Sequence, residues 1–154
     1  MDKIDYQILK CLKENSRIST SAIGETINMS VSAVSERIKR LENSGVIERY
    51  TAILNYNKVG KDVKAFISIR LEHPKYCTNF DQEIKKNPQV LECHYVAGDY
   101  DYMLKVVAKS TADLEKVIQF IKSIGGVHLT KTQIVLSSSK EEFTAMPSQE
   151  DLVK

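Results

Sequence analysis

Hydrophobic residues in the first fifty positions recur at the spacing of three short amphipathic helices. The first helix is predicted to begin at a capping pair, Asp2 and Asp5, and to end near Asn15. Its apolar stripe consists of Ile4, Ile8, Leu9 and Leu12. The second helix is predicted to begin at a hydroxyl cap, either Ser19 or Thr20.

A tight turn is predicted between the second and third helices. Asn28 tolerates the left-handed backbone that such a turn needs, and Ser30 can cap the helix that follows. Gly45 then suits the end of this third helix. Its apolar face consists of Val31, Val34, Ile38 and Leu41. Beyond it, β-branched and aromatic residues in 46–55 predict a short strand or hairpin arm, which would form a wing.

The pattern changes after a polar, glycine-bearing segment, 56–62, which we interpret as a linker between a first domain, 1–55, and a second, 63–137. The second domain alternates strand and helix patterns in the order βαββαβ, typical of an α+β, ferredoxin-like fold. The strands are expected at 63–71, 90–97, 101–108 and 127–136, and the helices at 76–86 and from 110 to 125. Residues 138–154 form a polar tail or arm.

Helices on one face of this sheet would leave the opposite face open. Met103 and Val107 alternate with the apolar residues Tyr102, Leu104 and Val106, so both faces carry apolar side chains. The open face is therefore predicted to be a dimer interface.

Composition narrows the class of protein without deciding its partner. The chain has 154 residues, 42% of them hydrophobic, and 22 basic against 20 acidic side chains, so a nucleic-acid role would depend on where charges lie. Neither a signal peptide nor a membrane span is apparent, which makes a cytoplasmic location the expectation. Three widely spaced cysteines predict neither a disulfide framework nor a zinc site.

Two short helices joined by a tight turn and followed by a wing are the arrangement of a winged helix-turn-helix. The third helix would then enter the DNA major groove, with small or polar residues near base edges and basic residues near phosphates. The candidate DNA-binding residues are Ser30, Ser32, Ala33, Ser35, Glu36, Arg37, Lys39 and Arg40. The alternative is a helical bundle whose charges form a solvated face.

The stretch GDYDY, residues 98–102, places two aspartates at the mouth of an otherwise apolar strand. Three explanations remain open from the residues alone: a catalytic or metal-binding carboxylate pair, a site for a small cationic or zwitterionic ligand, or an aspartate-bearing turn. His94, Asp99 and Asp101 could form an acid-base or metal set. No phosphate loop, nucleophile elbow or HExxH motif accompanies them, so we expect neither catalysis nor a metal or other cofactor.

Several motifs together resemble the Lrp/AsnC family, the leucine-responsive or feast/famine regulators of transcription. They are DKIDYQIL, NSRIS, SERIKRLENSGVIERYTAILN, AGDYDYMLKV and GGVHLTKTQIVL, which cover most of the chain. The resemblance implies a DNA-binding N-terminal domain and a βαββαβ domain that forms homodimers and often octamers. It also implies an amino-acid effector bound between subunits.

The resemblance assigns the effector loop to Gly98, Asp99, Tyr100 and Asp101, with Thr130 and Thr132 as weaker candidates. An aspartate can accept hydrogen bonds from the ammonium of an α-amino acid, and a glycine allows close approach to the backbone. The expected function is a DNA-binding transcriptional regulator whose assembly responds to that amino acid. The alternative is an architectural protein of the same fold that wraps DNA without an effector.

Overall fold

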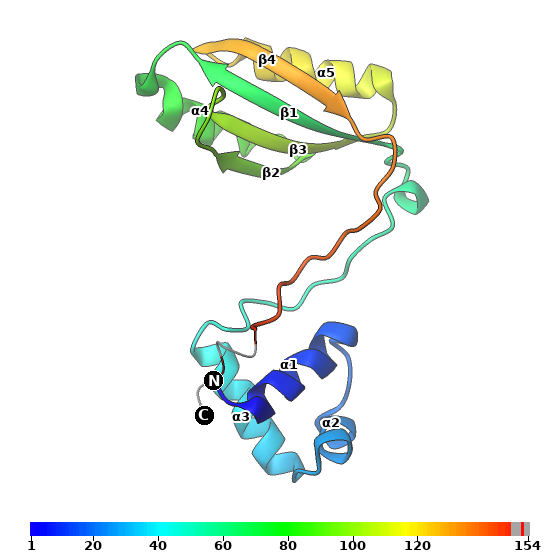
Figure 1. Cartoon of the computed structure of the whole chain (residues 1–154). Coiled ribbons are helices and arrows are strands. Elements are labelled where there is room, and N and C mark those ends of the chain that lie inside the picture. Colours follow the sequence, from blue (N-terminus) through cyan, green and yellow to red (C-terminus); the bar gives the residue numbers. More distant parts are fainter. Residues whose placement is uncertain (149–151, 153–154) are drawn as a thin grey trace. The chain divides into compact units, whose positions relative to one another are not determined.

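The computed structural model describes residues 1–148 and residue 152. The chain divides into two compact units, shown in Figure 1. The first, called here the helical unit, consists of Met1–Ala52 together with the described residues from Lys140 onward. The second, the sheet unit, is Ile53–Ser139.

Three helices build the helical unit: α1 (Lys3–Glu14), α2 (Thr20–Ile27) and α3 (Val31–Asn43). All three predicted starts are confirmed. The side chains of Asp2 and Asp5 each accept a hydrogen bond from the other residue's backbone N–H, while Ser19 and Ser30 cap α2 and α3. Asn28, with φ of 56°, makes the predicted left-handed turn between the last two helices.

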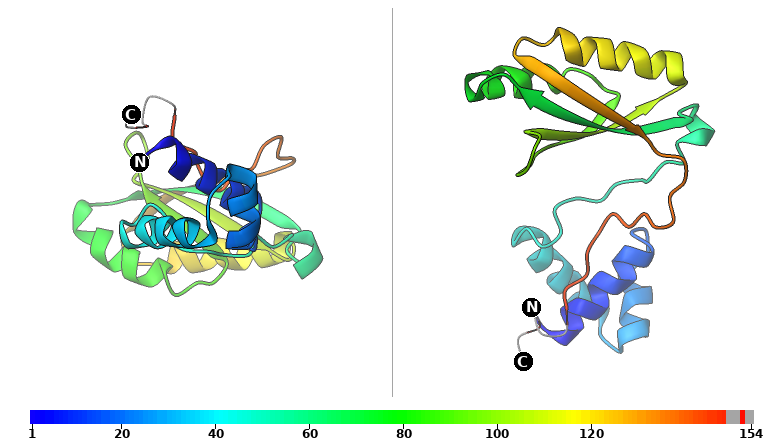
Figure 2. Two further views of the ribbon diagram at one scale, coloured as in Figure 1. Left: turned by 90° about the horizontal axis from the view of Figure 1, so that it is seen from below. Right: turned by 45° about the horizontal axis from the view of Figure 1, so that its top comes forward.

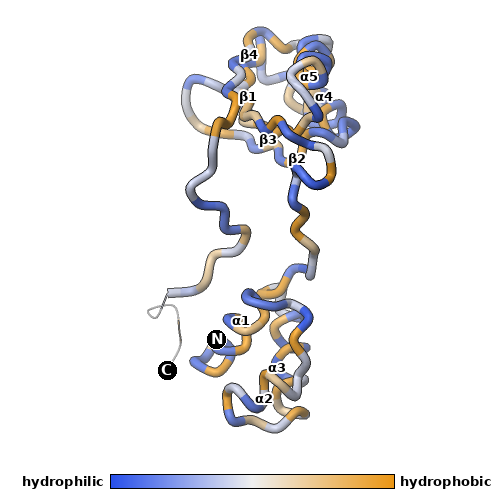
Figure 3. Tube along the Cα trace, turned by 90° about the vertical axis from the view of Figure 1, so that its right-hand side faces the viewer, coloured by the Kyte–Doolittle hydropathy of each residue, from blue (hydrophilic) through white to orange (hydrophobic). Residues whose placement is uncertain are grey.

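A small apolar core joins these three helices. Each contributes at least one fully or nearly fully buried side chain: Ile8, Ile23, Val34 and Leu41. Hydrophobic positions recur along each of the three helices in Figure 3, as expected for amphipathic helices that pack on one another.

The predicted wing strand is wrong for this chain by itself. Among the described residues, 46–55 form no strand, although the segment is rich in strand-forming residue types. Tyr50, Ile53 and Leu54 are largely exposed, and the Tyr50 hydroxyl donates a hydrogen bond to the Glu42 carboxylate at 2.9 Å. A strand needs a partner for its backbone groups. None of the described segments offers one here.

The sheet unit has the predicted βαββαβ order and is α+β. Its strands are β1 (Val63–Leu71), β2 (Val90–Tyr95), β3 (Tyr102–Ala108) and β4 (Val127–Ile134). They form one antiparallel sheet in the order β2-β3-β1-β4, and the helices α4 (Cys77–Ile84) and α5 (Thr111–Ser123) cover one face, as Figure 2 shows. Short 3₁₀ helices, η1 (Asn57–Val59) and η2 (Pro74–Tyr76), precede β1 and α4.

Register decides which side chains face the helices. Ile67 lies opposite Leu104 on β3 and Thr132 on β4, so these three share the helix-covered face. The main core of buried apolar side chains, including Phe80 and Ile121, lies on that face. The opposite face carries Phe66, Met103, Lys105, Val107, Leu129 and Lys131.

Gly126 allows the backbone before β4 to lie against Tyr76, the last residue of η2. Its φ is 92°, and a Cβ built there would overlap the Cβ and Cγ atoms of Tyr76. Only glycine combines this backbone conformation with so close an approach. It therefore helps to fix where β4 begins. In the part of the chain described, no helix is long and apolar enough to cross a bilayer, and Cys11, Cys77 and Cys93 are free and half-buried.

Candidate functional site

The N-terminal part of α3 presents small and polar side chains outward. Ser30, Ser32, Glu36 and Lys39 are exposed, whereas Ala33 and Ser35 are half-buried. The Ser30 hydroxyl accepts a hydrogen bond from the Ala33 N–H at 3.2 Å and lies 3.2 Å from the Ser32 hydroxyl. Ser30 thus has a capping role that leaves its hydroxyl at the surface.

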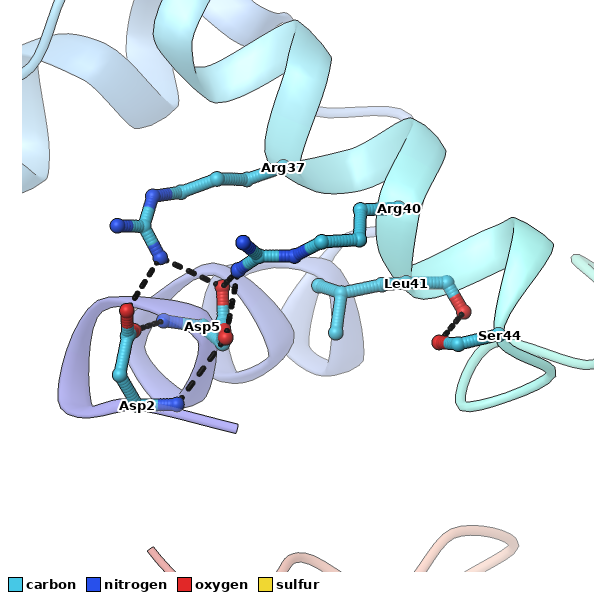
Figure 4. Close-up of polar contacts among 6 residues, drawn as sticks. All are labelled: Asp2, Asp5, Arg37, Arg40, Leu41 and Ser44. Carbon is cyan, nitrogen blue, oxygen red and sulfur yellow. Dashed lines mark hydrogen bonds and ion pairs between the residues drawn. The ribbon is translucent and has the colours of Figure 1, made fainter. Parts of the chain in front are cut away.

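Arg37 and Arg40, also on α3, are paired with the beginning of α1. Figure 4 shows both guanidinium groups converging on Asp2 and Asp5. Arg37 Nη1 lies 2.6 Å from Asp2 Oδ2 and 2.8 Å from Asp5 Oδ1, and Arg40 Nη2 lies 2.8 Å from Asp5 Oδ1 and 3.0 Å from Asp5 Oδ2. These contacts tie α1 to α3. We call this group of four residues the acid-arginine cluster.

Burial differs among the members of this cluster. The side chain of Asp5 is 3% exposed, that of Arg37 22% and that of Arg40 59%. Hydrogen bonds with Asp2 and Asp5 raise the pKa of Arg37. Burial alone would raise the pKa of Asp2, but the Asp5 N–H and Arg37 together lower it. Arg37 is therefore held mainly within the protein, while Arg40 keeps part of its guanidinium in water.

An open hollow runs along the outer surface of α3. It contains five of the predicted DNA-binding residues and two that the sequence pattern did not single out, Met29 in the turn and Asn43 at the helix end. Its lining residues are Met29, Ala33, Glu36, Arg37, Lys39, Arg40 and Asn43. Met29 precedes α3 and Asn43 ends it, so their place in the hollow follows from the fold and not from the local sequence pattern.

The loop between β2 and β3 holds the second predicted site. Gly98 has a φ of 136°, which favours glycine. The Asp101 carboxylate accepts a hydrogen bond from the Leu71 N–H at 2.7 Å, and the Asp101 N–H donates to the Ile69 carbonyl at 2.8 Å. Asp101 therefore anchors the loop to the end of β1, as an aspartate-bearing turn would.

Asp99 behaves differently from Asp101. Its carbonyl oxygen accepts a hydrogen bond from Arg70 Nε at 2.9 Å, and its side chain is exposed. Within the described chain, its carboxylate has neither a hydrogen-bond partner nor an ion-pair partner. Tyr100 beside it is half-buried. Of the two loop carboxylates, Asp99 is the one available to a ligand's ammonium.

Thr130 and Thr132 lie across β1 from this loop. Thr130 is opposite Ile69, whose carbonyl holds Asp101, whereas Thr132 is opposite Ile67, further along the strand. Both are half-buried on the helix-covered side of the sheet. Within this chain, the structure thus places Thr130 at the same end of β1 as the loop and does not bring Thr132 to it.

The possible acid-base or metal set is not assembled. His94 Nε2 lies 3.3 Å from Glu92 Oε2, whereas Asp101 is bonded to β1. Across the described ranges, no group of three histidine, cysteine, aspartate or glutamate side chains is arranged to hold a metal ion.

Two family models match the chain, one over each unit. Residues 1–48 match a winged helix-turn-helix DNA-binding model, and residues 64–145 match the Lrp/AsnC ligand binding domain. The HTH-type transcriptional regulator FL11 of Pyrococcus furiosus is 34% identical over 141 residues, which are 92% of this chain and 93% of that protein.

Solved structures extend the similarity to nearly the full length. A transcriptional regulator from Neisseria meningitidis in complex with L-methionine has a TM-score of 0.93, 28% identity and 99% coverage of each chain. The feast or famine regulatory protein from M. tuberculosis, complexed with L-methionine, has a TM-score of 0.87 and 30% identity, with 95% of this chain and 99% of that chain covered.

Proposed function

Because the chain belongs to the Lrp/AsnC family of DNA-binding transcriptional regulators, we propose that an α-amino acid bound at the loop 98–101 controls its assembly and DNA binding. The enzyme alternative is set aside, because the relatives are regulators. The observation that carries the proposal is the exposed carboxylate of Asp99, which has no partner in the described chain and lies beside Gly98 and Tyr100.

The chemistry of the loop suits an α-amino acid. The Asp99 carboxylate can accept charge-assisted hydrogen bonds from the ligand's ammonium. Gly98 allows the ligand to approach the backbone, and Tyr100 offers an apolar ring with a polar end. Thr130 or Thr132 of a neighbouring subunit would supply a hydroxyl to the ligand's carboxylate. The two neighbours complexed with L-methionine support an amino acid as the ligand class.

Assembly would connect this ligand to DNA. The open face of the sheet, with Phe66, Met103 and Leu129, is the proposed homodimer surface. Each dimer then presents two α3 helices to double-stranded DNA in the cytoplasm, and octamers present more. A ligand that binds one assembly better than another shifts the balance between them and so changes how many half-sites are engaged together.

A screen of purified protein against the twenty amino acids tests this proposal. A ligand at one hundred times its dissociation constant is expected to stabilise the folded protein by about 2.7 kcal/mol. That corresponds to a rise of about 5–10 °C in melting temperature for a chain of this size. Differential scanning fluorimetry at fixed protein concentration measures it.

Two variants separate binding from loop stability. Asp99→Asn is expected to abolish the ligand-induced shift and to leave the ligand-free melting temperature unchanged. Asp101→Ala is expected to lower the ligand-free melting temperature, because it removes the oxygen that accepts the Leu71 N–H. If no amino acid stabilises the wild-type protein, the architectural alternative, DNA wrapping without an effector, becomes the better interpretation.

A second prediction concerns Lys39, which is exposed on α3. Lys39→Gln is expected to weaken binding to all DNA sequences alike and to reduce the slope of log K against log salt by about 0.9, because one phosphate contact is lost. Fluorescence anisotropy with labelled DNA at several salt concentrations measures the slope. Lys122→Gln, which removes an exposed lysine from the last turn of α5, is the matched control. An unchanged slope in Lys39→Gln would remove Lys39 from the phosphate-contacting residues.

A further inference from the structure

The polar segment after the sheet unit packs with the helical unit. Lys13 Nζ, at the end of α1, lies 2.8 Å from Glu142 Oε2, and Lys140 Nζ lies 3.5 Å from Glu142 Oε1. Met146 and Pro147 further along are half-buried. The segment therefore has a defined contact with α1 and belongs to the helical unit.

The electrostatics of Glu142 agree with this contact. A hydrogen bond from Lys13, assisted by the positive charge of the same residue, lowers the pKa of Glu142, and Lys140 adds a smaller effect. Lys13 in turn lies in the last turn of α1. Because the ion pair is at the surface, it is weak by itself. Its contribution therefore depends on the chain between β4 and Glu142, which keeps the two charged groups of the pair close to each other.

Two chain segments connect the units, and they leave the sheet at one place. Ala65 on β1 lies opposite Ile134 on β4, and the Val135 N–H donates to the Lys64 carbonyl at 2.9 Å. Lys64 Nζ also donates to the Ser138 hydroxyl at 3.0 Å. The linker that enters β1 and the segment that leaves β4 therefore start side by side.

Of the two connections, the segment that leaves β4 is the shorter, so it limits the distance between the units more than the linker does. At about 3.5 Å per residue, the chain from Ile134 to Lys140 spans at most about 20 Å, whereas the linker from Ala52 to Val63 can span about 38 Å. When residues 140–148 are attached to the helical unit, the shorter connection limits its reach.

We propose that residues 140–148 are a strap that attaches to α1 through the Lys13–Glu142 ion pair and restricts the distance between the helical unit and the sheet. With the strap attached, the α3 helices of a dimer reach a narrower range of half-site spacings. Release of the strap leaves only the longer linker and widens that range. The inference needs the DNA-binding role of the family, and does not need an amino-acid effector.

Chymotrypsin cleavage of the full chain after Phe143 tests the strap. Phe143 is 54% exposed, and it lies next to Glu142. Reversing one charge, with Lys13→Glu or Glu142→Lys, is expected to raise the rate of cleavage after Phe143 about two- to fivefold. The double variant Lys13→Glu/Glu142→Lys restores the pair with opposite polarity and is expected to return the rate to that of the wild type. Mass spectrometry identifies the site.

An internal control is cleavage after Tyr95, which is 70% exposed on the sheet unit and distant in sequence from the strap. Its rate is expected to be the same in all four proteins. If the single reversals leave Phe143 cleavage unchanged, or if the double variant does not restore it, the strap is refuted. Restoration in oligomers reassembled from a mixture of the two single variants would also overturn it, because the tail would then attach to another copy.

Discussion

Replacing Asp5 with alanine is expected to destabilise the helical unit by about 3 kcal/mol. Its carboxylate is 3% exposed and accepts hydrogen bonds from both Arg37 and Arg40. Removing one partner of a buried ion pair leaves the other charge unpaired, at a cost of about 3–5 kcal/mol. The lower end applies because both arginines keep some contact with water. Urea unfolding followed by circular dichroism, at fixed protein concentration, measures the change.

Two further variants identify the cause of that loss. Arg37, at 22% exposure, is more buried than Arg40 at 59%, so Arg37→Met is expected to destabilise more than Arg40→Met. The double variant Asp5→Ala/Arg37→Met is expected to be more stable than the sum of its single changes predicts, because it leaves no buried guanidinium without a partner. Strictly additive losses would show that the cluster acts only through packing.

The acid-arginine cluster also reduces the positive charge with which α3 could attract DNA. Two guanidinium groups and two carboxylates make it formally neutral, so Arg37 and Arg40 add little net positive charge to this face. Attraction to phosphates then depends more on Lys39 and on Arg40's exposed portion. Direct phosphate contact by Arg37 stays a prediction. Its bonds to the two carboxylates both use Nη1, so Nε or Nη2 would be the donor to a phosphate.

Local signals predicted the helices of this chain well. The caps at Asp2, Ser19 and Ser30 act over three residues, and each places a helix start where the structure has it. Period-two alternation likewise predicted β1, because one of its faces is buried. The predicted wing strand at 46–55 is wrong because strand propensity is a local property, and a strand also needs a partner strand that the local sequence does not supply.

Longer-range contacts could not be predicted from sequence. Asp5 was predicted as a helix cap and Arg37 as a phosphate ligand, and each prediction was reasonable for its own segment. Their pairing depends on α1 and α3 packing together across 32 positions of sequence. The same holds for Asp101, whose bond to the Leu71 N–H follows from the register of β1 and β3. The sequence places Asp99 and Asp101 in one loop. In the structure the Asp101 carboxylate is bonded to β1, whereas the Asp99 side chain is exposed.

Gly24→Ala is expected to destabilise the helical unit by about 2 kcal/mol. Alanine would gain about 1 kcal/mol in helix propensity. However, a Cβ at position 24 would lie 2.5 Å from the carbonyl oxygen of Met29, and the Met29 N–H donates to the Gly24 carbonyl at 2.9 Å. This overlap is with backbone, so no change of rotamer relieves it, and the upper end of the cost of overpacking, about 3 kcal/mol, applies. The net loss is then about 2 kcal/mol.

The displaced turn would also move α3, because Met29 directly precedes the Ser30 cap. We therefore expect DNA affinity at constant salt to fall about tenfold, equivalent to one lost base contact. Gly125→Ala is the matched control: a Cβ at position 125 would have no described atom within 4 Å beyond its chain neighbours, so the stability change should stay within about 0.5 kcal/mol. If Gly24→Ala stabilised the protein, helix propensity would outweigh the close approach. The separation of α2 and α3 would then be adjustable, with no need for glycine at this position of α2.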